Sequence, residues 1–186
     1  MATKRLTIDG YGQVELNNVA FRRDGRIEAQ CAPDTTDFAT IPVENGMLLA
    51  VDNVTRTVKI AKDGSLPIAL VYSAEHLYEE KALGLKNFKL NGKDDFLPRL
   101  GYTALADKFT TNCLAYDDGE FANDAALITA LKELATPIYG GVSEVGAIKI
   151  SKTAPAFGPV YRVILAYTMP DGQFGVKLQQ IPEIAG

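Results

Sequence analysis

The chain has 186 residues and a mass of 20.1 kDa, a length that favours one domain with a single substantial core. Apolar residues make up 47% and charged residues 23% of the sequence, which excludes an extensively disordered chain. The net charge of −4 without a long basic run argues against a nucleic-acid partner, and no apolar run approaches the roughly 20 residues of a membrane-spanning helix.

The first predicted element is a β-hairpin within residues 17–31. A three-residue loop, Arg23-Asp24-Gly25, would place Phe21 opposite Ile27, so that apolar side chains share one face. In such a loop Gly25 takes the left-handed position that glycine adopts without a steric penalty.

Residues 45–72 consist of aliphatic and β-branched runs that are interrupted by turn-forming residues. The interruptions at Asn45-Gly46, Asp52-Asn53 and Asp63-Gly64 predict a three-stranded antiparallel meander. Ser73 can cap a helix that follows it, so the sequence also predicts a short second helix at about 74–82.

Residues 106–116 alternate between two faces, with Phe109 and Cys113 on the same one, and this alternation predicts a single strand. Since Cys113 shares a face with Phe109, we expect its thiol to lie in the core.

The clearest predicted element is an amphipathic helix at about 124–135. Its apolar side chains follow the spacing of one helical stripe, Asn123 or Asp124 would cap its first turn, and Pro137 would end it. The stripe consists of Leu127, Ile128, Leu131 and Leu134.

The chain closes with a second hairpin, whose two long strands flank the turn Pro170-Asp171-Gly172. Many short strands with one good helix predict an α+β, β-rich fold, an antiparallel sandwich or barrel with the helix packed on it. We expect residues 1–186 to form one domain, with a subdivision near residues 80–95 as the alternative.

The stretch "YDDGEF" gathers the carboxylates of Asp117, Asp118 and Glu120 between a strand and a helix. A calcium loop that begins at Asp117 would need a bidentate Glu at its twelfth position, where Ile128 stands, so this motif does not fit. Polar residues and carboxylates are common just before a helix, so we interpret the stretch as a turn with exposed charges.

The histidine His76 and the thiol of Cys113 are a candidate base and nucleophile. A core thiol ionises with difficulty, and His76 lies among glutamates on the predicted second helix, so we expect neither to be catalytic. The residues themselves predict no catalytic, cofactor or metal site.

Three stretches resemble a known class of proteins: "PVENGMLLAVDNVTRTVKI", "ALVYSAEHLYEE" and "LPRLGYTALADKFTTNCLAYDDGEF". They are similar, over residues 42–121, to the head-decoration or capsid-stabilising proteins encoded beside the major capsid protein of tailed bacteriophages. The resemblance implies a non-enzymatic virion protein that is made in the host cytoplasm, binds the major capsid protein on the capsid surface and forms a homo-oligomer. It carries over no individual site residue.

Two alternatives stay open at this point. One is a tail or host-surface-binding virion module, and the other is a small enzyme or metal-binding protein that uses the acidic turn near Asp117. For a virion protein, the candidate partner-binding residues are Arg22, Arg23 and Arg26, the densest positive cluster in an acidic chain. Arginine suits such a role because its guanidinium pairs with carboxylates in a bidentate manner.

Overall fold

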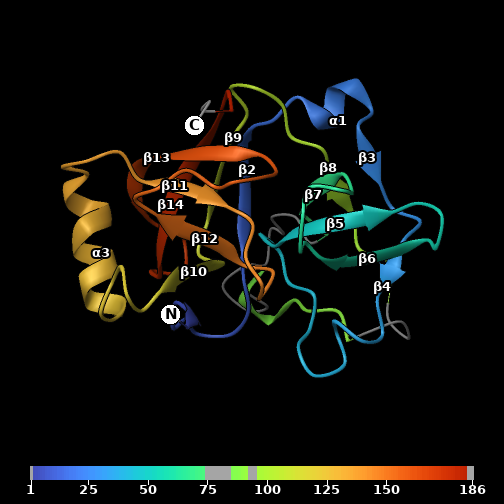
Figure 1. Ribbon diagram of the computed structural model, residues 1–186, viewed down its shortest axis with the longest axis horizontal. Coiled ribbons are helices and arrows are strands. Elements are labelled where there is room, and N and C mark those ends of the chain that lie inside the picture. Colours follow the sequence, from blue (N-terminus) through green and yellow to red (C-terminus); the bar gives the residue numbers. More distant parts are fainter. Residues whose placement is uncertain (1, 74–84, 92–95, 184–186) are drawn as a thin grey trace.

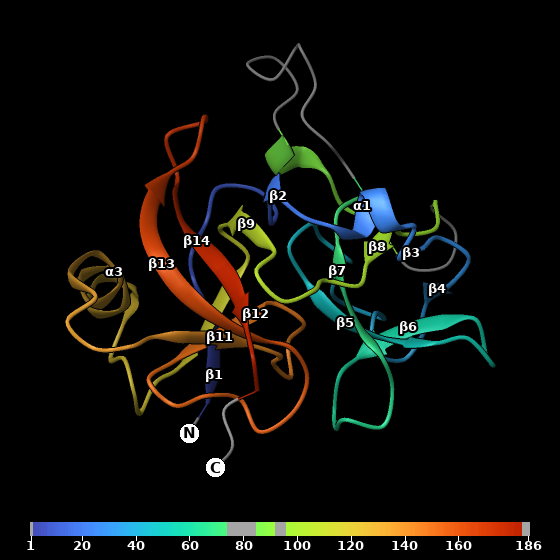
Figure 2. The ribbon, with the colours of Figure 1, turned by 90° about the horizontal axis from the view of Figure 1, so that it is seen from above.

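The computed structural model describes residues 2–73, 85–91 and 96–183. Its strands form two sheets that lie side by side, and the long helix packs on the far side of the first sheet (Figures 1 and 2). The predicted α+β, β-rich, sandwich-like fold is confirmed. The second helix expected at about 74–82 lies outside the described residues, as does most of the region near 80–95.

The first sheet has eight strands, in the spatial order β1 (Thr3–Arg5), β10 (Leu114–Asp117), β12 (Ile148–Ser151), β11 (Tyr139–Gly141), β13 (Val160–Thr168), β14 (Phe174–Ile181), β9 (Lys108–Thr111) and β2 (Val14–Asn18). The second has six, in the order β3 (Ile27–Glu28), β8 (Leu100–Gly101), β7 (Ile68–Val71), β5 (Leu48–Asp52), β6 (Thr57–Ile60) and β4 (Ala32–Pro33). The helical elements of the described residues are α1 (Phe21–Asp24), the 3-10 helix η1 (Leu85–Asn87) and α3 (Asp124–Glu133). Among the strands of the described residues, β10 pairs in parallel with β12 and β4 with β6, while the other pairs are antiparallel.

The strand predicted at 106–116 is two strands, so that prediction is wrong. The backbone turns at Cys113, where the Leu114 N–H donates to the Asn112 carbonyl over 2.9 Å. The resulting strands β10 and β9 occupy the second and seventh places of the first sheet, although only Asn112 and Cys113 separate them along the chain. The sheet must therefore curl back on itself.

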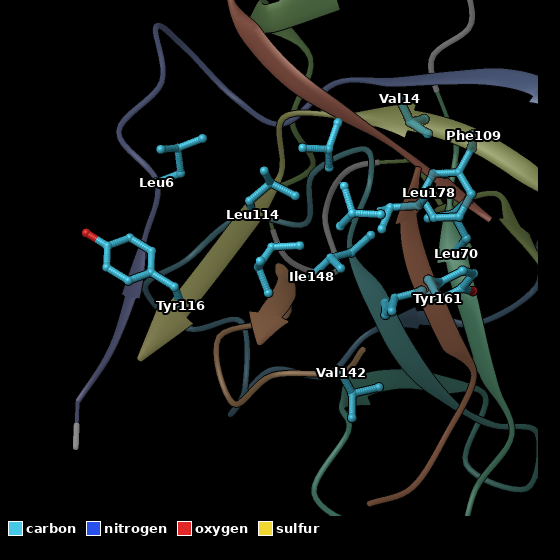
Figure 3. Packing of buried hydrophobic residues seen from close by; sticks show 14 of the residues in the cluster. Leu6, Val14, Leu70, Phe109, Leu114, Tyr116, Val142, Ile148, Tyr161 and Leu178 are labelled. Carbon is cyan, nitrogen blue, oxygen red and sulfur yellow. The ribbon is translucent and has the colours of Figure 1, made fainter. Parts of the chain in front are cut away.

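The first hydrophobic cluster gathers side chains from strands of the first sheet and, among others, Leu70 of the second sheet (Figure 3). Phe109 and Tyr161, both fully buried, meet edge to face with ring centroids 5.2 Å apart. Leu114, Ile148 and Leu178 lie in the same cluster and are also buried. Burial of such side chains stabilises a fold by roughly 1.5–3 kcal/mol each, so this cluster contributes substantially to the stability of the molecule.

Residues 46–72 form three antiparallel strands as predicted, but the meander order is wrong. Strand β7 pairs with β5 and not with β6, so β5 is the central strand. Leu48 and Ala50 of β5 lie in the first hydrophobic cluster, whereas Leu49 and Val51 lie in a second one. A strand that is buried on both faces is placed best between two neighbours, where its backbone groups are also paired.

The hairpin predicted within residues 17–31 is wrong. Strand β2 pairs with β9 in the first sheet and β3 with β8 in the second, so the segment between them crosses from one sheet to the other as the short helix α1. Phe21 begins this helix, is fully buried, and packs with its ring centroid 5.0 Å from that of Tyr72. Gly25 is left-handed as expected, with φ of 69°, but it ends a helix instead of a hairpin loop.

The helix predicted at about 124–135 is confirmed as α3. Its N-cap is Asn123, whose side chain accepts a hydrogen bond from the Ala126 N–H, and Leu127 and Leu131 are fully buried. The closing hairpin is confirmed as β13 and β14, with Gly172 at φ of 85° in its turn.

An ion pair between a half-buried arginine and a buried glutamate joins the two sheets. Arg5 on β1 donates to both carboxylate oxygens of Glu44, over 2.6 and 2.8 Å, and the Glu44 side chain is only 3% exposed. The same carboxylate accepts from the Gly12 N–H over 2.6 Å. Glu44 precedes β5, so this contact ties the second sheet to the edge of the first.

The close approach of the sheets at Gly46 leads to a test. Gly46→Ala is expected to lower the free energy of unfolding by about 3 kcal/mol, because the new Cβ would lie 2.3 Å from Thr111 Oγ1 and 2.9 Å from Cys113 Cβ at a φ of +86°. Gly172→Ala is the matched control, since it has a φ of +85° and no atom within 4 Å, and it should cost about 1 kcal/mol. Urea unfolding measures both, and equal losses would contradict a tight contact between the sheets.

Candidate functional site

The three arginines of the predicted site lie at one end of the molecule, on and just after α1. Arg22 and Arg23 are exposed, and the Arg23 Nε donates to the Asp24 carboxylate over 2.9 Å. Arg26 is only half-buried, yet its Nε is buried without a hydrogen-bond partner. The structure thus brings the three residues close together, and of the three Arg22 and Arg23 are exposed while Arg26 is half-buried.

Asp107 fixes α1 in place. One oxygen of this buried carboxylate accepts from the Ala20 N–H at the start of α1, over 2.8 Å. The other accepts from the Ala104 N–H, over 2.9 Å. The Asp107 side chain therefore joins the start of α1 to the turn at residues 104–107, so the helix that carries Arg22 and Arg23 is held in place.

Two exposed apolar side chains accompany the arginines. Ile27 on β3 is 39% exposed, and Leu105, within the turn that Asp107 clamps to α1, is 62% exposed. The α1 surface is defined here as Arg22, Arg23, Arg26, Ile27 and Leu105. The expected hairpin would have covered Ile27, and Leu105 carries no local sequence signal, so neither was predicted.

The acidic turn differs from the expected turn with exposed charges, because its carboxylates are half-buried and engaged by neighbouring strands. Asp117 accepts from the Lys149 ammonium over 2.6 Å and from the Thr3 hydroxyl over 2.9 Å. The Lys149 ammonium holds the pKa of Asp117 below its usual range. Asp118 accepts from the Ala2 N–H, so the turn binds the first strand to the sheet.

The remaining carboxylates of this region go to different partners. Glu120 accepts from the Lys152 N–H, and Asp124 accepts from the Thr7 N–H over 3.0 Å and the Tyr116 hydroxyl over 2.7 Å. Burial and the Asp124 carboxylate raise the pKa of Tyr116 to about 12. Across residues 2–73, 85–91 and 96–183, no group of three or more His, Cys, Asp or Glu side chains is arranged to hold a metal ion.

The thiol of Cys113 lies in the second hydrophobic cluster with no exposed surface. Burial raises its pKa to about 12, so it is a thiol at neutral pH, and its sulfur lies 3.7 Å from an Arg5 donor. His76, the other member of the candidate pair, lies outside the described residues. Cys31 is also free and buried, 1% exposed.

Comparisons of this chain with protein-family models, with curated proteins and with solved structures found no match. Within the part of the chain that the structure describes, no helix combines the length and the apolar character needed to cross a bilayer. The candidate site is therefore the α1 surface, defined by its own geometry.

The ion pair of Asp117 leads to a prediction with a definite pH dependence. Asp117→Asn should lower the free energy of unfolding at pH 7 by about 1 kcal/mol, because it removes the charge that pairs with Lys149. A carboxylate with a lowered folded-state pKa stabilises the fold above its unfolded pKa of about 3.9, and this contribution is lost as the pH falls through the folded pKa. The difference between variant and parent should therefore vanish at acid pH.

Asp118→Asn is the neighbouring control for that measurement. Its carboxylate lies 3.8 Å from the Lys4 ammonium, and both side chains are more exposed than those of the Asp117 pair. We expect a change within about 0.5 kcal/mol at every pH. A pH-independent loss in Asp117→Asn would show that shape, and not charge, matters at this position.

The burial of the thiols predicts their reactivity. In a Cys31→Ser variant, the Cys113 thiol should react slowly with a disulfide reagent in the native protein and rapidly in denaturant, because a buried thiol with a raised pKa forms little thiolate. The release of the reagent's chromophore measures both rates. Fast labelling of the native variant would restore Cys113 as a candidate nucleophile.

Proposed function

We propose that this chain is a non-enzymatic capsid-decoration protein of a tailed bacteriophage. In this proposal it is made in the host cytoplasm, is localised on the virion surface, and binds the outer face of the major capsid protein through the α1 surface. It acts there as a homo-oligomer. The resemblance over residues 42–121 supports the class of protein, and the α1 surface supports the mode of binding.

The observation that carries the mode of binding is the combination of charge and apolar area on an anchored element. Protein interfaces are enriched in arginine and depleted in lysine and acidic residues relative to the rest of the surface, and their centres bury apolar side chains. Arg22 and Arg23 offer guanidinium groups for carboxylates of a partner, while Ile27 and Leu105 offer apolar area beside them. Since Asp107 fixes α1 beforehand, little conformational entropy is lost on docking.

A capsid lattice makes moderate affinity sufficient. A protein that binds only the assembled, expanded shell stabilises that shell by mass action, and every copy on the lattice adds its contribution. Self-association around a symmetry axis of the shell would add avidity without a stronger single contact.

The test is co-sedimentation with expanded, undecorated heads of the phage that encodes the chain. The native protein should co-sediment at low salt and progressively less as salt rises, because charges at the edge of an interface act mainly on association. Arg22→Ser with Arg23→Ser should weaken binding by on the order of tenfold with an unchanged circular dichroism spectrum. Arg26→Ser is made separately, since the Arg26 Nε is buried.

A second double variant, Lys132→Ser with Arg162→Ser, removes two exposed positive charges elsewhere, on α3 and β13. It should co-sediment like the native protein. Equal weakening of the two double variants would reduce the effect to net charge and overturn the role of the α1 surface. Failure of the native protein to co-sediment at low salt would overturn the decoration function itself.

A further inference from the structure

A groove of about 650 Å³ opens between the two sheets, away from the α1 surface. The first sheet contributes Asp117 and Lys149 to its wall, and the second sheet contributes Ile60, with Asp37 and Lys62 from the loops that follow its strands β4 and β6. A smaller pocket of about 290 Å³ adjoins it and shares Val142, Lys149 and Phe157 with it. Volumes of this size are typical of pockets that bury small organic ligands.

Each wall of the groove carries one lysine–aspartate pair. On the first sheet the Lys149 ammonium lies 2.6 Å from Asp117, with the side chains 33% and 19% exposed. On the second sheet the Lys62 ammonium lies 3.1 Å from Asp37, whose other oxygen accepts from the Ile60 N–H over 2.9 Å. Two pairs of opposite charge therefore face the groove from opposite walls.

These pairs offer hydrogen bonds without offering net charge. An ammonium has three N–H donors, and the paired aspartate accepts from one of them. A carboxylate has about four acceptor positions, and two of these are occupied in each of Asp37 and Asp117. Donors and acceptors are thus left over side by side on each wall. The exposed Glu144 at the groove leaves it slightly negative, which disfavours an anion, while the paired lysines disfavour a cation.

The apolar part of the groove is held by both sheets. Phe157 contributes to both cavities, and its Cβ lies 3.4 Å from the place where a Cβ on Gly64 of the second sheet's β6–β7 turn would stand. Gly158 follows Phe157 in the chain and has a φ of +78°. It lies so close to Ile68 that a Cβ added to Gly158 would lie 2.7 Å from Ile68 Cδ1. An aromatic side chain with apolar neighbours is thereby fixed beside the two ion pairs.

We propose that this groove binds an uncharged saccharide. Vicinal hydroxyl groups each donate and accept, so they match a donor and an acceptor that stand side by side on an ion pair. The apolar face of a sugar ring would lie against Phe157 and Val142, and the two linked cavities suit an oligosaccharide of two or three rings. The site does not depend on the capsid-binding function and uses none of the α1 surface.

The experiment is a titration of the nitrogen-15-labelled protein with lactose, maltotriose, cellotriose and N-acetylchitotriose, followed by two-dimensional NMR. At least one of these saccharides should shift the amide signals of Val142, Ser143, Lys149 and Phe157. Lys62→Met and Lys149→Met should each weaken that binding by about fivefold or more, the effect of losing one hydrogen bond. Lys62 is 74% exposed, so its variant tests the groove without a risk to folding.

Lys59→Met is the matched control. Lys59 pairs with Asp52 over 2.9 Å, and the two side chains are 30% and 14% exposed, close to the values for Lys149 and Asp117. It does not line the groove, so its variant should bind the saccharide like the native protein.

Three results would overturn the proposal: no shifted signals with any of the four saccharides, shifts confined to residues outside the groove, or equal weakening by Lys59→Met. Tighter binding of sialyllactose or inorganic phosphate than of the uncharged saccharides would also overturn it, since the ligand would then be an anion. None of these outcomes bears on co-sedimentation with heads, so this proposal and the decoration function fail separately.

Discussion

The ion pair between Arg5 and the buried carboxylate of Glu44 is the polar contact that ties the edge of the first sheet to the second. The Glu44 side chain is 3% exposed, and the hydrogen bonds that water would give its carboxylate come instead from the Arg5 guanidinium and the Gly12 N–H. Separation of the sheets would leave these charges unpaired. The groove is lined by residues of both sheets, so its shape depends on this contact together with the hydrophobic clusters that the two sheets share.

Elements whose structure is set by the local sequence pattern could be predicted. Elements whose structure is set by pairing with strands far away in the sequence could not. The apolar stripe of α3, which includes Leu127 and Leu131, is set by residues close together in the sequence, and so is the turn at Gly172. Both α3 and the final hairpin could therefore be predicted. The hairpin expected around Gly25 does not form, because the strands on its two sides pair elsewhere. Strand β2 pairs with β9 in one sheet and β3 pairs with β8 in the other, and both partners lie more than 70 residues away in the sequence. The turn at Cys113 could not be predicted either. The alternation of side chains in the sequence continues past this residue, and the separation into β9 and β10 arises from their pairing with different strands.

The candidate site was predictable in part. A dense run of arginines in an acidic chain is visible as sequence, whereas the exposure of Leu105 and the clamp by Asp107 arise only when the turn at residues 104–107 meets α1. The acidic turn was recognised as a turn, but its ion pair with Lys149 joins positions 32 residues apart. The groove could not have been predicted, because its two ion pairs come from opposite sheets and no local motif links them.

The pairing of β1 with β10 has a consequence for synthesis. Thr3 pairs with Asp117, so the first strand leaves the ribosome long before its partner exists, and β2 likewise waits for β9. The strands β5, β6 and β7 lie close together in sequence and can pair early, whereas closure of the curled sheet requires β14, close to the C-terminal end of the described chain. Such long-range pairing slows folding and leaves strand edges open meanwhile. A nascent chain of this design would therefore be most vulnerable to aggregation at its own N-terminal strands, until its last hairpin is made.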